Sequence, residues 1–176
     1  MANGRLIILM RFTAFPIMKS LSTDRGHTFS SPTRTEMWSV WANVLSLPSG
    51  VLVATAGRPG VGLWTSSDGY GEEWTYHNLL AAHNARVSDP SWRYSPILSD
   101  LRNFSDYLAC HDVMPRQTTG YTALTAVEHE GNRSTVVVSY DRLSNGWAGP
   151  APGAKWGAED RVFTMRVAID AGSGKP

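Results

Sequence analysis

Residues 41–74 read WANVLSLPSGVLVATAGRPGVGLWTSSDGYGEEW, and this stretch decides the fold class. Its three apolar runs, at 42–47, 51–56 and 61–65, are separated by PSG at 48–50 and GRPG at 57–60. Runs of this length between Gly, Pro and Ser residues predict short antiparallel strands joined by tight turns. A polar turn that ends in an aromatic residue follows the third run. The stretch therefore predicts an all-β protein.

A turn of the form Ser-x-Asp-x-Gly-x-Thr-aromatic occurs at 22–29, and 66–74 contains a less regular copy. The Asp side chain can accept backbone N–H bonds and close such a turn, while Gly takes a positive φ at its tip. We expect the final aromatic ring to pack between sheets as a buried wedge. The first turn is formed by Ser22, Asp24, Gly26, Thr28 and Phe29, and the second by Ser66, Asp68, Gly71 and Trp74. The copies lie roughly 40–50 residues apart, the length of one four-stranded propeller blade.

Composition limits the classes of function. The chain has 176 residues, enough for one domain, and a net charge of +1, which favours neither nucleic acid nor an anionic membrane as a partner. One cysteine excludes an internal disulfide and a thiolate metal site, and the five histidines show no metal-ligand spacing with carboxylates. No apolar run approaches the roughly 18 residues of a membrane span. We expect no metal and no cofactor.

The remaining chain divides into segments of unequal regularity. We expect repeat units at about 5–37, 38–80 and 121–169, an irregular unit at 81–120, and a flexible tail at 171–176. Residues 79–85 are the only local helix candidate, 94–100 are expected to form a strand leading into a degenerate turn, and 141–147 are expected to form a third, weaker Asp-Gly-Trp turn. The first strand starts almost at the first residue, so the chain is expected to begin inside a sheet, as a part of a longer protein.

These features together resemble the C-terminal part of the sialidase (neuraminidase) superfamily, whose six-bladed propellers carry the turn described above as the Asp-box, or BNR repeat. The resemblance rests on the two Asp-boxes, GRPG at 57–60, GYT at 120–122, YDRL at 140–143 and RVFTMRV at 161–167. It implies an incomplete β-propeller of three to four blades. The remaining blades would come from missing sequence or from another chain.

The resemblance also implies a site for a sialoside substrate. Sialidases bind the sialic acid carboxylate with three arginines, and a tyrosine activated by a glutamate is the nucleophile, an exception to the usual carboxylate pair. By position, Tyr121 corresponds to the nucleophile, and Arg58, Arg93 and Arg11 correspond to the carboxylate-binding arginines. The alternative for Arg58 is a solvated turn residue, and for Tyr121 a residue that packs on a neighbouring strand. For Arg93 and Arg11 the alternative, a surface arginine, is favoured.

Two departures from the family affect activity. Trp41-Ala42-Asn43 occupies the expected position of the activating glutamate, with Glu36 nearby at the wrong offset, and the acid/base aspartate belongs to a blade that this chain does not contain. A phenol is a poor nucleophile without a base. The expected function is that of a sialidase-like glycoside hydrolase domain, which releases terminal sialic acid from glycoconjugates but is inactive as this chain alone. The alternative is a non-catalytic propeller that binds a glycan or a protein.

Overall fold

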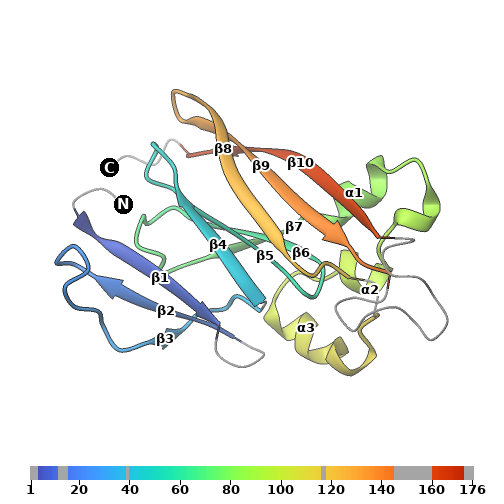
Figure 1. Cartoon of the computed structure of the whole chain (residues 1–176), viewed down its shortest axis with the longest axis horizontal. Coiled ribbons are helices and arrows are strands. Elements are labelled where there is room, and N and C mark those ends of the chain that lie inside the picture. Colours follow the sequence, from blue (N-terminus) through green and yellow to red (C-terminus); the bar gives the residue numbers. More distant parts are fainter. Residues whose placement is uncertain (1–3, 12–15, 39, 116–117, 145–159, 173–176) are drawn as a thin grey trace.

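The described residues of the computed structural model form three antiparallel sheets, and none of these sheets is closed (Figure 1). The structure describes residues 4–11, 16–38, 40–115, 118–144 and 160–172. The predicted all-β class is confirmed, because strands predominate and the helices are few and short. No helix in these ranges is long and apolar enough to cross a membrane.

The stretch 41–74 forms most of the central sheet, whose four strands follow one another in chain order. The strands are β4 (Val40–Ser46), β5 (Leu52–Gly57), β6 (Val61–Ser66) and β7 (Thr75–Asn78). The three predicted runs are therefore β4, β5 and β6. Every residue of β5 is buried, and β6 is almost as fully covered. Both faces of these strands are packed, which explains why the runs are continuously apolar rather than alternating.

A three-stranded sheet lies on each side of the central one (Figure 1). In chain order, the first sheet contains β1 (Leu6–Arg11), β2 (Ile17–Ser22) and β3 (Thr33–Arg34). The central sheet is the second, and the third contains β8 (Thr122–Glu130), β9 (Arg133–Arg142) and β10 (Arg161–Asp170). Strand β4 packs against both β1 and β8, so the first strand of the central sheet connects all three sheets. The first two sheets share a pattern, because an Asp-box follows β2 in one and β6 in the other.

The irregular segment between the second and third sheets is helical. It contains α1 (Leu80–Arg86), η2 (Pro90–Trp92), α2 (Pro96–Ser99), α3 (Phe104–Cys110) and η3 (His111–Val113). The helix candidate at 79–85 is thus confirmed, but the strand expected at 94–100 is wrong, and α3 was not predicted. Proline is tolerated in the first turn of a helix, where its missing N–H has no partner to lose, and Pro96 begins α2 in this way. The Asn103 side chain accepts a hydrogen bond from Asp106 N and caps α3.

Trp38 lies at the centre of the packing that joins the central sheet to the helical segment. Its side chain is 2% exposed. The ring contacts Trp64 edge-on at 5.6 Å between centroids and Tyr76 at 4.3 Å, both from the central sheet. On the other side it stacks with Tyr107 of α3 at 6.4 Å. The aromatic cluster therefore holds α3 against β6 and β7.

The first Asp-box turn is closed by hydrogen bonds to its aspartate. Thr28 donates from its backbone N to Asp24 Oδ1 at 2.9 Å and from Oγ1 to Oδ2 at 2.6 Å. Ser22 Oγ donates to Asp24 Oδ1 and accepts from Gly26 N, each at 2.8 Å. The buried wedge expected at the end of this turn is not observed, because Phe29 is 41% exposed. At Phe29 the chain has already left the turn, and Ser30 N donates a hydrogen bond to Leu21 O of β2 at 2.8 Å.

The second turn is held by more backbone donors than the first. The Asp68 carboxylate accepts from the backbone N atoms of four residues, 70 to 73, and from Ser66 Oγ at 2.8 Å. Trp74 is half-buried against the core and donates from Nε1 to Gly71 O at 2.9 Å. The ring of Trp74 therefore closes this turn, although it is not fully covered. Both turns use an aspartate to replace backbone pairing where the chain leaves a strand.

Acid titration tests the first turn. Hydrogen bonds from the Thr28 side chain and backbone, and then from Ser22, lower the pKa of Asp24 from 3.8 to about 2. A carboxyl whose pKa is lower in the folded state adds stability above pH 3.8, and this stability is lost as the pH falls through about 2. By NMR of the carboxyl carbon, we expect a midpoint near pH 2 in the unmodified protein and a higher midpoint in Thr28→Val. Thr23→Val is the control, and equal midpoints in both variants would contradict the bonding.

Candidate functional site

The candidate site lies where strands of the second and third sheets begin or end side by side. Arg58 directly follows β5, and Tyr121 directly precedes β8. Strand β8 packs against both β4 and β5. The Asn43 side chain of β4 fixes this arrangement by donating from Nδ2 to Thr122 O of β8 at 2.7 Å. Two residues far apart in sequence are thus placed at neighbouring strand ends.

Arg58 and Tyr121 are in contact. The Arg58 guanidinium carbon lies 5.4 Å from the centroid of the Tyr121 ring, which is within the range of a cation–π interaction. Trp41 meets the same ring edge-on, at 6.0 Å between centroids and 80° between the planes. The Tyr121 and Trp41 side chains are 55% and 63% exposed, and Arg58 is half-buried. The cation of Arg58 and the two accessible aromatic rings of Tyr121 and Trp41 therefore form one surface, the Arg58 surface.

The backbone at this surface adopts an unusual conformation in two places. Trp41 has φ 59° and Arg58 has φ 57°, both in the left-handed region that bulky side chains rarely enter. Trp41 lies within the irregularity of register between Val40 and Asn43 of β4. Such a bulge re-aims a side chain at the edge of a sheet. Backbone strain of this kind concentrates at functional sites, where the surrounding structure compensates its cost.

Close packing around the GRPG turn explains its glycines. A Cβ atom at Gly57 would lie 2.7 Å from Thr119 Cγ2, closer than such atoms approach one another. Gly60 has φ +67°, and its N donates to Thr118 Oγ1 at 2.7 Å. The turn is therefore tied directly to the segment that leads into Tyr121. A larger residue at Gly57 would require Thr119 or the turn itself to shift.

Asp141 holds the start of β8 in place. Its Oδ1 accepts hydrogen bonds from Gly120 N at 2.6 Å and from Tyr121 N at 3.2 Å. Burial raises the pKa of Asp141, an effect that these two N–H donors and the positive charge of Arg58 oppose. The third Asp-box-like turn expected at 141–147 is thus wrong at its start, because Asp141 and Arg142 belong to β9 and Asp141 bonds across to another strand. Residues 145–147 lie outside the described residues.

The other two predicted arginines occupy different positions. Arg11 is the last residue of β1, and its side chain is exposed. It stands in the first sheet where Arg58 stands in the second, at the end of the strand that precedes the Asp-box strand. Arg93 is exposed in the helical segment, and its carbonyl accepts a hydrogen bond from Arg142 Nη2 at 3.2 Å. Of the four predicted site residues, Arg58 and Tyr121 are the two that the structure brings into contact.

Two members of the site were not predicted as such. Trp41 was noted only as part of the segment that replaces the expected glutamate, and Asp141 only as part of a turn. One sequence signal could have singled out Trp41. It is a large aromatic residue at the start of a strand whose residues do not alternate between apolar and polar, so no pattern predicts that its side chain is buried. Asn43, in that same segment, bridges two strands and carries no charge. Among the described residues, no group of three or more His, Cys, Asp or Glu side chains is arranged to hold a metal ion.

The chain was compared with models of protein families, with curated proteins and with solved structures, and none of them matches it.

Proposed function

We propose that this chain is a sialidase-like propeller domain whose Arg58 surface binds terminal sialic acid on glycoconjugates. The observation that carries the proposal is the contact between the Arg58 guanidinium and the Tyr121 ring at 5.4 Å. A guanidinium beside a phenol is the pair that a sialidase-type site requires. One monosaccharide, on the order of 5–10 Å across, is large enough to touch both groups.

The chemistry of each group fits an acidic sugar. Arg58 presents a planar fork of donors that matches a carboxylate in two parallel hydrogen bonds. The exposed ring of Trp41 gives a flat apolar surface on which the less polar face of a sugar can lie. The Oδ1 atom of Asp141 accepts hydrogen bonds from Gly120 N and Tyr121 N, so this carboxylate oxygen faces the backbone. The site therefore attracts an anion at Arg58 and an apolar face at Trp41.

The sheet arrangement supports a propeller scaffold. The first strand of the central sheet packs against both neighbouring sheets, and each Asp-box follows the next-to-last strand of its sheet. In a propeller, strands of neighbouring blades meet around the axis in this way. The four-stranded central sheet has the size of one full blade, and the other two sheets supply three strands each.

A second candidate, a non-catalytic propeller that binds a glycan, is favoured by Asn43. This side chain stands on β4 where an activating glutamate is expected, and its amide is engaged with Thr122 O. An amide cannot remove a proton from the phenol of Tyr121, so we expect binding without hydrolysis from this chain alone.

Titration of N-acetylneuraminic acid by calorimetry tests the binding site. We expect saturable binding that Arg58→Lys weakens about tenfold, because an ammonium group cannot form the bidentate pair. Arg133→Lys, at an exposed arginine of β9, is the matched control. A fluorogenic sialoside added to the same protein should show no hydrolysis. Equal affinity in the unmodified protein and Arg58→Lys would overturn the site, and hydrolysis would exclude the non-catalytic candidate.

A further inference from the structure

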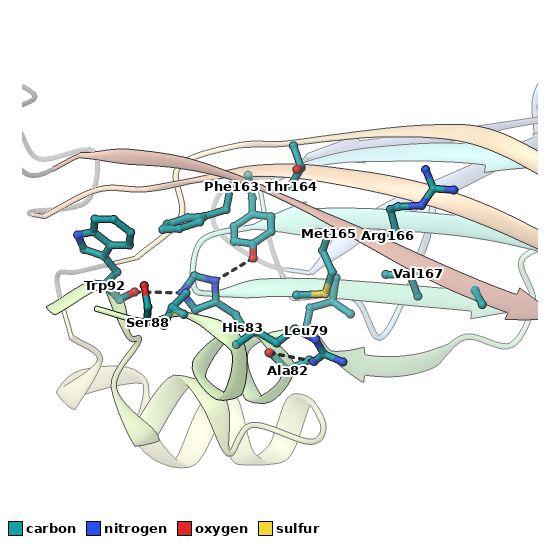
Figure 2. A pocket seen from close by; sticks show the side chains of 14 residues that line it. Leu79, Ala82, His83, Ser88, Trp92, Phe163, Thr164, Met165, Arg166 and Val167 are labelled. Atoms are coloured by element: carbon teal, nitrogen blue, oxygen red, sulfur yellow. Dashed lines mark hydrogen bonds between the residues drawn. The ribbon is translucent and has the colours of Figure 1, made fainter. Parts of the chain in front are cut away.

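A cavity of about 760 Å³ lies between α1 and β10 (Figure 2). None of the residues of the Arg58 surface lines it. Its helical wall includes Leu79, His83 and Trp92, and its sheet wall includes Phe163 and Met165. A volume of this size and a largely apolar, aromatic lining are typical of sites for small molecules.

The cavity exists because an edge strand is only partly covered. Strand β10 pairs with β9, and β10 is the last strand of its sheet among the described residues. Successive side chains of a strand point to opposite faces, and Phe163, Met165 and Val167 share one face and are half-buried. Figure 2 shows these three along β10, with Trp92 beside the Phe163 end. Apolar surface that α1 does not cover is thus available at the wall.

The polar groups at the base of the cavity already have partners. His83 Nε2 lies 3.0 Å from Trp92 O, and Nδ1 lies 2.9 Å from Tyr140 Oη. A carbonyl oxygen can only accept, so Nε2 carries the hydrogen, and Nδ1 accepts from the Tyr140 hydroxyl. Burial lowers the pKa of His83, which keeps the ring neutral in this arrangement. The base therefore offers aromatic surface without a charge, and the Phe163 ring meets the His83 ring edge-on at 4.7 Å.

Among the described residues that line the cavity, the charged side chains are both arginines. They are Arg86 of α1 and Arg166 of β10. Arg166 is paired with Glu128 at 2.6 Å. The exposed Arg86 donates from Nη1 to Ala82 O at 3.1 Å, which uses one of the five N–H donors of a guanidinium. Arg86 therefore has donors to offer an anion at the mouth.

We propose that this cavity binds a small aromatic carboxylate. The ring of the ligand packs against the apolar wall formed by Phe163 and Met165, with Trp92 at its end, where edge-on and offset contacts between rings are favourable. The carboxylate reaches Arg86, whose planar fork can bind both oxygens. This site is separate from the Arg58 surface and does not depend on the function proposed for it.

The test uses 3-phenylpropionate as the probe and 3-phenylpropan-1-ol as its uncharged counterpart, each titrated into ¹⁵N-labelled full chain and followed by NMR. We expect the acid to bind with a dissociation constant on the order of 0.1–1 mM and to shift the amide signals of α1 and β10. The alcohol should bind at least about tenfold more weakly, because it cannot pair with a guanidinium.

Substitutions separate the two parts of the site. Arg86→Gln should weaken the acid about tenfold and leave the alcohol unchanged, whereas Arg102→Gln, at an exposed arginine outside the cavity, should change neither. Ala82→Leu fills the cavity with a residue that favours helix, and should abolish binding of both compounds. Arg58→Lys should leave both unaffected. Equal binding of acid and alcohol, shifts that map outside α1 and β10, or an unchanged affinity in Arg86→Gln would overturn the proposal.

Discussion

Trp38→Ala is expected to lower the free energy of unfolding by about 3–5 kcal/mol, the usual cost of removing a buried tryptophan. The side chain is 2% exposed and contacts rings from the central sheet and from α3. Alanine leaves a large cavity at the point where these elements meet, and the surrounding rings cannot all move in to fill it. The loss is a large fraction of the total stability of about 5–15 kcal/mol that a domain possesses.

Denaturant unfolding followed by circular dichroism measures this loss. Trp38→Phe keeps a ring in the cluster and should lower the free energy of unfolding less than Trp38→Ala. It still allows the measurement if Trp38→Ala does not fold. Trp41→Ala, at an exposed tryptophan of β4, provides the matched control and should cost much less. Equal midpoints for Trp38→Ala and the unmodified protein would show that the aromatic cluster does not hold the central sheet to the helical segment.

The strands of the central sheet could be predicted from the sequence because the turn residues that separate them are local signals. PSG at 48–50 and GRPG at 57–60 interrupt the apolar runs, and the resulting strands β4, β5 and β6 agree with them. The Asp-box turns were visible for the same reason, since the residues that bond to Asp24 and Asp68 lie within five positions of them. Features that depend on a few neighbouring residues can be read from one sequence.

The helical segment was largely missed because its helices are too short to show a period. Helices α1 and α3 have seven residues each and α2 has four, less than the 11–18 residues over which a helical pattern can be counted. The usable signals were at the N-termini instead. The dipeptides Asp89-Pro90 and Ser95-Pro96 and the Asn103 cap each mark a helical start.

The candidate site likewise has features that the sequence predicts and features that depend on the fold. The sequence singled out Arg58 and Tyr121 separately, but their contact depends on β5 and β8 packing side by side, which no local pattern encodes. The exposure of Phe29 and the hydrogen bond that Tyr121 N donates to Asp141 also follow from how the sheets are placed. The role of Trp41 depends on its backbone angle, which a sequence does not reveal for a bulky residue.

Trp41→Gly is expected to weaken sialic acid binding about tenfold without lowering stability. Removal of the ring takes away the apolar face beside Tyr121, a contact worth about 0.5–1.5 kcal/mol. Glycine also relieves the left-handed conformation at φ 59°, which costs a bulky residue about 1–2 kcal/mol.

Trp41→Ala separates the ring from the strain. Alanine removes the ring but retains the unfavourable φ, so both variants should bind sialic acid equally weakly, while Trp41→Gly should be about 1 kcal/mol more stable than Trp41→Ala. Calorimetric titration and denaturant unfolding of the two proteins give both comparisons. A glycine variant that binds as tightly as the unmodified protein would remove Trp41 from the site. A glycine variant less stable than the alanine variant would show that the backbone there is not strained. If both expectations hold, the strain at Trp41 serves to present its ring beside Arg58 and Tyr121, at a cost in stability that the fold does not require.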